Sequence, residues 1–212
     1  MAKIYTTHDR SVPPYEEQFP TPGFLPTTPA LISVADEETG IPNIMPAVGW
    51  GFLNRLPLYL GVAVSVQEHT VDYYKRGTHQ LLKRAMDFAL NFPTDRLREE
   101  VALCGKLSRA KDPNVDKFKE AGLTPVPGKR ISSPHIGECP INYECKVGPI
   151  VPMGSHDLFL GEVVGCFTDG VVGSGRSPVH GTTRLEMTRD DGTVLVIEFE
   201  SWIREVSDSA RD

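Results

Sequence analysis

The stretch ECPINYECKV, residues 138–147, indicates how the chain folds. From residue 141 onward every second side chain is apolar, which is typical of a β-strand with one face in a core. The predicted inward face consists of Ile141, Tyr143, Cys145 and Val147. The other face consists of Asn142, Glu144 and Lys146. The stretch is therefore interpreted as one strand of a β-rich domain.

The same region offers a second interpretation, as a metal site. Two thiols and two imidazoles occur close together in the sequence: His135, Cys139, Cys145 and His156. Structural zinc sites usually contain cysteines paired two to four residues apart, and that spacing does not occur here. We therefore expect no metal ligands and interpret Cys145 as a buried free thiol.

Other segments extend the β pattern in both directions. The sequence contains 18 prolines and 19 glycines, which favour many turns and therefore many strands. Segments 29–36 and 43–52 are predicted to pair as a hairpin, and 58–66 is a nearly continuous apolar strand. Residues 141–147, 156–167 and 183–206 are also predicted to be mainly β, with a hairpin turn at DDG.

Three helices are predicted between these strands. Leu81, Leu82, Ala85, Met86 and Ala89 recur at helical spacing. Thr94 is the predicted N-cap of a helix over 95–104. A third helix lies within 112–122, capped by Asp112 or Asn114 and ended by Gly122. Short helices among antiparallel strands favour a mainly β fold, a barrel with helical decoration.

Composition limits the domain plan and the function classes. We predict a proline-rich arm over 1–29, a main domain over 30–170, and a C-terminal β-hairpin extension over 171–212 packed on that domain. A net charge of −6 argues against nucleic acid or an anionic membrane as the main partner. Four cysteines, no apolar stretch long enough to cross a membrane and no export signal predict a cytoplasmic protein.

Four segments carry residues suited to binding. GIPNIMPAVGW (40–50) is a turn followed by small residues whose amides can approach an anion or a flat ring. CGKLSRAKDPNVDKF (104–118) offers a hydroxyl and several cations, which suit a phosphate monoester. FALNFPT (88–94) presents Asn91, and GSHDLFLGEVV (154–164) presents His156. Taken singly, each segment has a plainer interpretation. These are a hairpin turn for 40–50, a solvated charged face for 104–118, a strand end for 88–94 and a loop histidine for 154–164.

Taken together and in this order, these motifs resemble the flavin reductase-like, FMN-binding split-barrel family, in particular its flavoredoxin-like branch. The resemblance runs from about residue 30 to residue 167. It rests on GIPNIM, LGVAVSVQEHT, FALNFPT, CGKLSRAKDPNVDKF, ECPINYECKV and GSHDLFLGEV. It implies an antiparallel split β-barrel, a homodimer with FMN near the interface, and NAD(P)H as electron donor.

The resemblance also implies roles for individual residues. The predicted cofactor-binding residues are Asn43, Ile44, Met45, Pro46, Ala47, Val48, Thr70, Asn91, Ser108 and Lys117. Ser108 and Lys117, with Thr70, would hold the phosphate, and Asn91 would approach the isoalloxazine ring. His156 is the single catalytic candidate. Pro46 stands where many members have Thr or Ser, and proline offers neither a hydroxyl nor an N–H.

The implied activity is an NAD(P)H:flavin oxidoreductase that passes electrons from a nicotinamide to FMN and on to an acceptor, such as a monooxygenase. One alternative is a flavoredoxin-type electron carrier that makes no direct use of NAD(P)H. Another is a flavin-binding protein without turnover. Because the cofactor supplies the chemistry, binding residues matter here more than nucleophiles.

Overall fold

The computed structural model describes residues 29–66 and 76–169, together with the backbone of three short strands beyond them. The predicted arm, residues 1–29, lies outside this range except for its last residue. The strands are β1 (Ala30–Val34), β2 (Asn43–Ala47), β3 (Trp50–Arg55), β4 (Leu58–Ser65), β5 (Asp87–Phe92), β6 (Pro125–Val126), β7 (His135–Ile136), β8 (Ile141–Pro152), β9 (His156–Thr168), β10 (Val171–Val172), β11 (Thr183–Thr188) and β12 (Val194–Phe199). The helices are α1 (Gly77–Ala85), α2 (Arg98–Lys106), preceded by the 3-10 turn η3 (Asp95–Leu97), and α3 (Lys117–Glu120).

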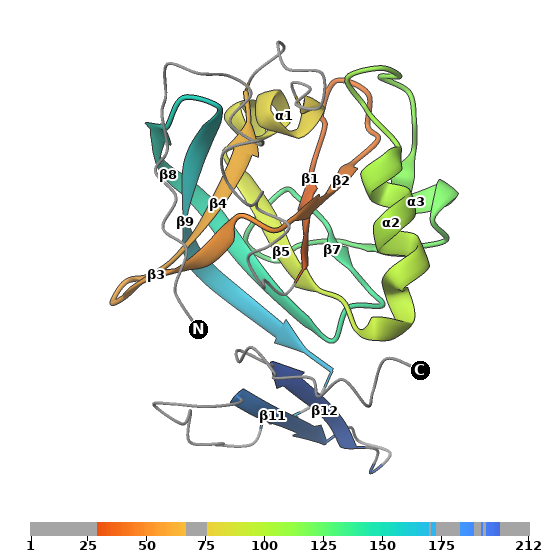
Figure 1. The fold of residues 1–212 in the computed structure, drawn as a ribbon, viewed down its shortest axis with the longest axis vertical. Coiled ribbons are helices and arrows are strands. Elements are labelled where there is room, and N and C mark those ends of the chain that lie inside the picture. The colour runs from red at the N-terminus through yellow and green to blue at the C-terminus, as the bar shows by residue number, and fades with distance from the viewer. Residues whose placement is uncertain are drawn as a thin grey trace, which may run out of the picture.

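Seven strands form one sheet in the order β2-β1-β5-β8-β9-β4-β3. Every neighbouring pair in it is antiparallel. Strands β2 and β3 stand at opposite ends of this order, yet only residues 48 and 49 separate them in the chain. The sheet must therefore curl until its two ends meet. The predicted mainly β, antiparallel barrel is confirmed (Figure 1).

The barrel has two apolar clusters, one on each side of β1 and β2. The inner cluster fills the barrel and includes Ile32, Met45, Val62, Phe88 and Phe159. The outer cluster joins the other face of the same strands to the helices and includes Leu31, Ile44, Cys104 and Phe118. Side chains alternate between the faces of a strand, so Leu31 and Ile32 belong to different clusters. Helices α2 and α3 lie beside β2 (Figure 1).

The opening stretch forms the central strand β8, as predicted. Ile141, Cys145 and Val147 belong to the inner cluster, and Tyr143 packs against it. On the opposite face, Asn142 is 6% exposed and Glu144 is 0% exposed, whereas Lys146 is exposed. A loop from residue 128 to residue 135 covers that face and hydrogen-bonds to Glu144.

The helices differ from the predictions mainly at their ends. Helix α1 ends before Met86, which adopts a left-handed conformation with φ 54°, and Ala89 belongs to β5. The N-cap of α2 is Leu97 instead of Thr94, because η3 comes first. Asp116, not Asp112 or Asn114, caps α3 by accepting a hydrogen bond from the Lys119 N–H. Gly122 follows α3 with φ 64°, as expected for a helix-ending glycine.

The C-terminal hairpin is formed by β11 and β12, which pair antiparallel from Thr183↔Phe199 to Thr188↔Val194. Gly192 lies in the predicted turn between them with φ 83°. The packing of this hairpin on the barrel remains a prediction. No helix in the described part of the chain is long and apolar enough to span a membrane.

Candidate functional site

A pocket of about 140 Å³ lies where the start of α1, strand β2 and the α2–α3 segment meet. Its lining consists of Asn43, Met45, Pro46, Arg76, Gly77, Thr78, Cys104, Gly105, Leu107, Ser108, Arg109 and Lys117. Three of these side chains are cations, and none of the described lining residues is a carboxylate. The pocket therefore favours an anionic ligand.

The beginning of α1 lies at this pocket. The N-cap residue, Arg76, makes no side-chain capping hydrogen bond, and the first turn contains no acidic residue. Gly77 and Thr78, the first two helical residues, line the pocket. The first N–H groups of a helix have no partner within it and carry a partial positive charge. Such a helix start is suited to a phosphate group.

Gly77 allows this helix start to lie against the segment after α2. A Cβ at Gly77 would come 3.0 Å from Arg109 Cβ and 3.2 Å from the Ala110 backbone nitrogen. Both are closer than ordinary contacts, and the second involves backbone that cannot rotate away. Glycine therefore permits the close approach that brings the α1 amides and Ser108 to one pocket.

Lys117 brings a buried ammonium group to the same place. It is 4% exposed, and its Nζ donates to the carbonyl oxygens of Ile44 at 2.8 Å and Cys104 at 2.9 Å. Burial lowers the pKa of Lys117 to about 8. No carboxylate of the described residues pairs with it, and one of its three N–H donors is left for a ligand. A phosphate would supply the missing negative charge.

Arg109 is already paired and acts mainly on the loop before β2. Its Nη2 lies 2.7 Å from Asp36 Oδ2, and its Nη1 donates to the Ile41 carbonyl at 2.7 Å. Burial alone would raise the pKa of Asp36, but hydrogen bonds and the nearby Arg109 and Arg84 cations lower it. The carboxylate of Asp36 compensates much of the guanidinium charge, so Lys117 is the stronger candidate for anion binding.

Asn43 differs from these cationic donors because its neutral amide also carries an acceptor oxygen. It is 1% exposed at the start of β2, and its Nδ2 donates to Thr78 Oγ1 at 2.8 Å. Its Oδ1 is buried without a hydrogen-bond partner in the described part of the chain. A buried acceptor without a donor is costly, and this one lies out of reach of solvent beside the pocket.

The predicted β2 residues divide between pocket and core. Met45 and Pro46 line the pocket with Asn43, whereas Ile44 and Ala47 are buried in the outer and inner clusters. The contribution of Ile44 to the pocket is its carbonyl, which holds Lys117. Val48 is 53% exposed beyond the end of β2. Ile44 and Ala47 therefore offer no direct side-chain contact to a ligand in the pocket.

Asn91 is placed elsewhere, in a buried network. It is 0% exposed, and its Nδ2 donates to the Leu31 carbonyl at 2.8 Å and to Ser33 Oγ at 2.9 Å. Its Oδ1 accepts from the Ile136 N–H and from Asn142 Nδ2. These contacts satisfy the amide and hold it within the sheet. The approach of Asn91 to a flavin ring remains a prediction.

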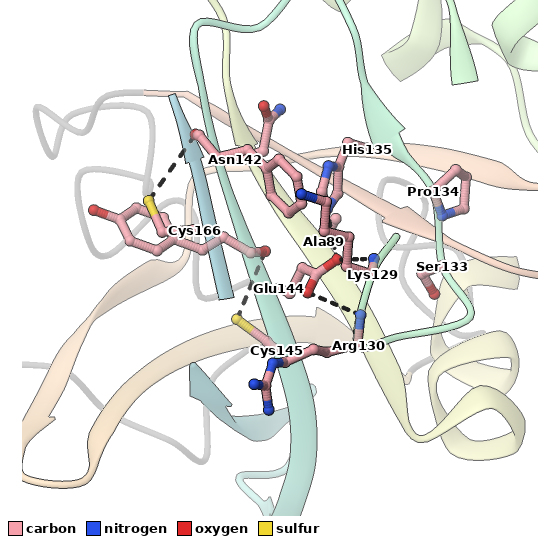
Figure 2. Close-up of polar contacts among 12 residues, drawn as sticks. Ala89, Lys129, Arg130, Ser133, Pro134, His135, Asn142, Glu144, Cys145 and Cys166 are labelled. Atoms are coloured by element: carbon pink, nitrogen blue, oxygen red, sulfur yellow. Dashed lines mark hydrogen bonds and ion pairs between the residues drawn. The ribbon is translucent and has the colours of Figure 1, made fainter. Parts of the chain in front are cut away.

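Glu144 anchors the loop beside Asn91 in the same way. Its carboxylate accepts from the backbone N–H groups of Lys129 and Arg130 and pairs with His135 Nε2 at 3.1 Å (Figure 2). Cys145 faces the inner cluster, Cys139 belongs to the outer cluster, and the Nδ1 of His156 contacts Ser155 Oγ. The four metal-ligand candidates thus occupy separate environments. Within the described ranges, no group of three or more His, Cys, Asp or Glu side chains is arranged to hold a metal.

His156 is not among the described residues that line the pocket. His156 pairs with Ser65 across β9 and β4, and the Arg76 N–H donates to the Ser65 carbonyl at 3.4 Å. Burial and the nearby Arg76 cation lower the pKa of His156, which favours its neutral form. A role for His156 remains a prediction, and Thr70 lies outside the described residues.

Sequence reasoning missed Arg76, Gly77 and Thr78. The available signal was a glycine at a helix start with no acidic residue after it, in RGTHQ. That pattern departs from usual capping, where Ser, Thr, Asp or Asn precedes acidic residues. An unusual helix start of this kind is therefore worth examining as an anion site.

The size of the pocket sets what it can hold. Sites that enclose whole drug-sized ligands typically measure about 300–1,000 Å³. The 140 Å³ pocket suits a phosphate and the atoms next to it, and a larger cofactor must extend outside it. Beyond Val48 the hairpin of β3 and β4 exposes Phe52, Leu53 and Leu56, which are 61%, 49% and 90% exposed.

Comparisons with known proteins identify the family of the chain. The model of the family described as "Flavin reductase like domain" matches residues 22–178. An uncharacterized protein from Archaeoglobus fulgidus is 37% identical over 123 residues, which cover 58% of this chain and 63% of that protein. The chain thus spans less than two thirds of that relative.

Among solved structures, an FMN-binding protein from Thermus thermophilus is 27% identical, with a TM-score of 0.61 over 88% of this chain and 97% of that one. Nitrilotriacetate monooxygenase component B from Bacillus cereus shares the fold with a TM-score of 0.71. That match covers 97% of this chain and 100% of the other at 17% identity, which shows the fold alone.

Proposed function

The chain belongs to the flavin reductase-like family, and we propose that it is a flavoprotein oxidoreductase that binds FMN and reduces it with NAD(P)H. When bound, FMN supplies the hydride and electron chemistry. The protein's own residues bind the cofactor, orient it and exclude water around its phosphate. This proposal explains why the described site is rich in donors and has no paired nucleophile and base.

The observation that carries the proposal is the buried Lys117 ammonium beside the uncapped start of α1. An isolated buried charge is costly unless an opposite charge accompanies it. A phosphate monoester can accept from Lys117 Nζ, the α1 amides and the Ser108 hydroxyl together. The residues present therefore fit the phosphate of FMN, although Pro46 contributes no donor.

We also propose that the protein is a homodimer and that the flavin ring lies near the interface. The pocket holds only the phosphate end, so the ring must be covered by other surfaces. Val48 and the exposed apolar residues of the β3–β4 hairpin follow directly from the pocket-lining strand β2. Light scattering of the purified protein tests this part, and a monomer that retains FMN would contradict it.

The test of the activity begins with absorbance of the purified protein after addition of FMN and removal of the excess. Retained flavin bands are expected. Oxidation of NADH or NADPH is then followed with FMN present and an electron acceptor such as cytochrome c. A protein that binds no flavin overturns the proposal. A protein that binds FMN, but whose flavin neither nucleotide reduces, is instead the flavoredoxin-type carrier.

The physiological acceptor is a separate part of the proposal. A monooxygenase component is our candidate, supported by the fold shared with the Bacillus cereus protein. Reduced flavin delivered to a partner would appear as NAD(P)H oxidation coupled to product formation by that partner. The monooxygenase candidate would be excluded if NAD(P)H oxidation stayed uncoupled from product formation with every oxygenase whose gene lies beside the gene of this protein.

A further inference from the structure

Lys117 places a second kind of chemistry in the pocket, because a lysine amine is a nucleophile as well as a cation. Its Nζ has three positions besides the bond to the side chain, and two of them donate to the carbonyl oxygens of Ile44 and Cys104. The third position has no partner among the described residues. It holds a proton in the ammonium form and the lone pair in the neutral amine. The two carbonyls thus fix the direction in which the amine can react.

The surroundings of Lys117 favour the neutral amine more than those of a surface lysine. Burial is the main reason that its pKa falls to about 8, and the Arg76 and Arg109 cations lower it further. Cys104 lines the same pocket, but burial raises the pKa of its thiol to about 11. Near pH 8 the amine is therefore neutral in a large fraction of molecules, whereas the thiol stays protonated.

The pocket also selects which reagents can reach this amine. Its described lining has three cations and no carboxylate, and its volume of about 140 Å³ suits a phosphate with a few atoms attached. A small acyl phosphate meets both conditions, because it joins an anionic phosphate to an electrophilic carbonyl carbon. Binding the phosphate brings that carbon into the same small space as Lys117, which favours reaction between the two.

We infer that Lys117 is a modification site, acylated by small acyl phosphates such as acetyl phosphate without the help of another enzyme. The Nζ lone pair attacks the carbonyl carbon, and the bond from that carbon to the phosphate oxygen breaks. Inorganic phosphate leaves with the proton that the amine loses, and the product is an amide without positive charge. The acylation step rests on the pocket alone. Its consequence, weaker binding of FMN, rests on the proposed function.

The experiment incubates the purified full chain with acetyl phosphate at pH 8, before any flavin is added, and follows each lysine by peptide mass spectrometry. Lys119, exposed on the same short helix, is the internal control. Lys117 should be acetylated about tenfold faster than Lys119, because its neutral fraction is larger and the reagent is bound beside it. Inorganic phosphate should slow the reaction of Lys117 only. Acetic anhydride, which carries no phosphate, should show no preference for the buried Lys117.

Two outcomes would overturn the inference whether or not FMN binds. The first is that Lys117 reacts no faster than Lys119, or equally fast with inorganic phosphate present. The second is an equal preference for Lys117 with acetic anhydride, because the phosphate would then have no part in the selection.

A further measurement separates the inference from the proposed function. If Lys117 is acetylated selectively but the unmodified protein binds no FMN, the proposed function fails and the modification site stands. If FMN does bind, quenching of flavin fluorescence should show about 100-fold weaker binding by the acetylated protein, since a charge-assisted hydrogen bond is lost. Bound FMN should also protect Lys117 from acetyl phosphate. Unchanged affinity after acetylation would overturn the consequence for FMN.

Discussion

Two buried polar regions of this protein differ in whether their hydrogen bonds are complete. Around β8, Glu144 accepts two backbone N–H groups and His135, and Asp87 accepts from Ser132 and Ser133. In the pocket, Lys117 has no carboxylate partner among the described residues and Asn43 Oδ1 has no donor. Complete networks stabilise a fold, whereas incomplete ones leave groups for a ligand. The difference separates structural residues from binding residues of the same chemical types.

The sharpest test of the complete network is Glu144→Gln. The substitution replaces one carboxylate oxygen with an NH₂ group, which cannot accept a hydrogen bond. The loop N–H groups of Lys129 and Arg130, which both donate to that carboxylate, are then poorly paired. We expect the free energy of unfolding to fall by about 3 kcal/mol. Urea denaturation measures this effect, and FMN affinity should change by less than about twofold.

A matched control is Glu138→Gln. Glu138 is exposed and accepts from the Thr124 N–H, so its loss should cost under about 1 kcal/mol. If the two variants were equally stable, burial would not be what makes the Glu144 network important.

The incomplete region is tested next by Lys117→Met, which keeps the length of the side chain and removes its charge. FMN affinity should fall about 100-fold, because a charge-assisted hydrogen bond to phosphate is lost. Isothermal titration calorimetry measures the affinity. Lys119→Met, on the exposed side of the same short helix, is the control and should bind FMN normally. Normal binding by Lys117→Met would remove Lys117 from the phosphate site.

The affinity for FMN should also depend on pH. The pKa of Lys117 is about 8 without ligand, and a bound phosphate raises it by favouring the ammonium form. Above pH 8 the free protein has lost a proton that the complex retains, so binding takes up a proton. Affinity should therefore fall up to about tenfold per pH unit above pH 8. Titrations at pH 7, 8 and 9 test this, and in Lys117→Met the slope should disappear.

The smallest expected effect concerns how the pocket is assembled. A methyl group in Gly77→Ala would press on the Ala110 backbone and shift the start of α1, weakening FMN about fivefold. Gly105→Ala is the matched control in the same lining, because its Cβ would meet Pro46 Cγ at an ordinary 3.7 Å. Equal affinities for the two variants would mean that the position of the α1 amides is unimportant.

Much of the fold could be predicted because apolar periodicity reflects burial directly. The strand at Leu58–Ser65 and the pairing of β1 with β2 both follow from local patterns. Helix ends were less predictable, since Met86 could continue the apolar spacing of α1 yet turns the chain into β5. The alternation of β8 placed Glu144 on its polar face, and only the loop that covers Glu144 explains why this carboxylate is buried.

The candidate site was predictable only in part. Asn43, Met45, Pro46, Ser108 and Lys117 were expected at a ligand and all line the pocket. Asn91 has the same side chain as Asn43, and no local pattern distinguishes the two. Neighbours that are 58 and 45 residues away, Ser33 and Ile136, complete the hydrogen bonds of Asn91.

The sequence by itself determined the strands, their antiparallel character and the family, because these depend on periodicity and on motifs in a fixed order. Tertiary structure alone decided which polar groups remain unpaired. Whether a buried donor or acceptor is satisfied depends on atoms within about 3 Å, and folding brings those atoms from distant segments. That is why ECPINYECKV was recognisable as a strand from its letters, whereas the difference between Asn43 and Asn91 required the atoms around each of them.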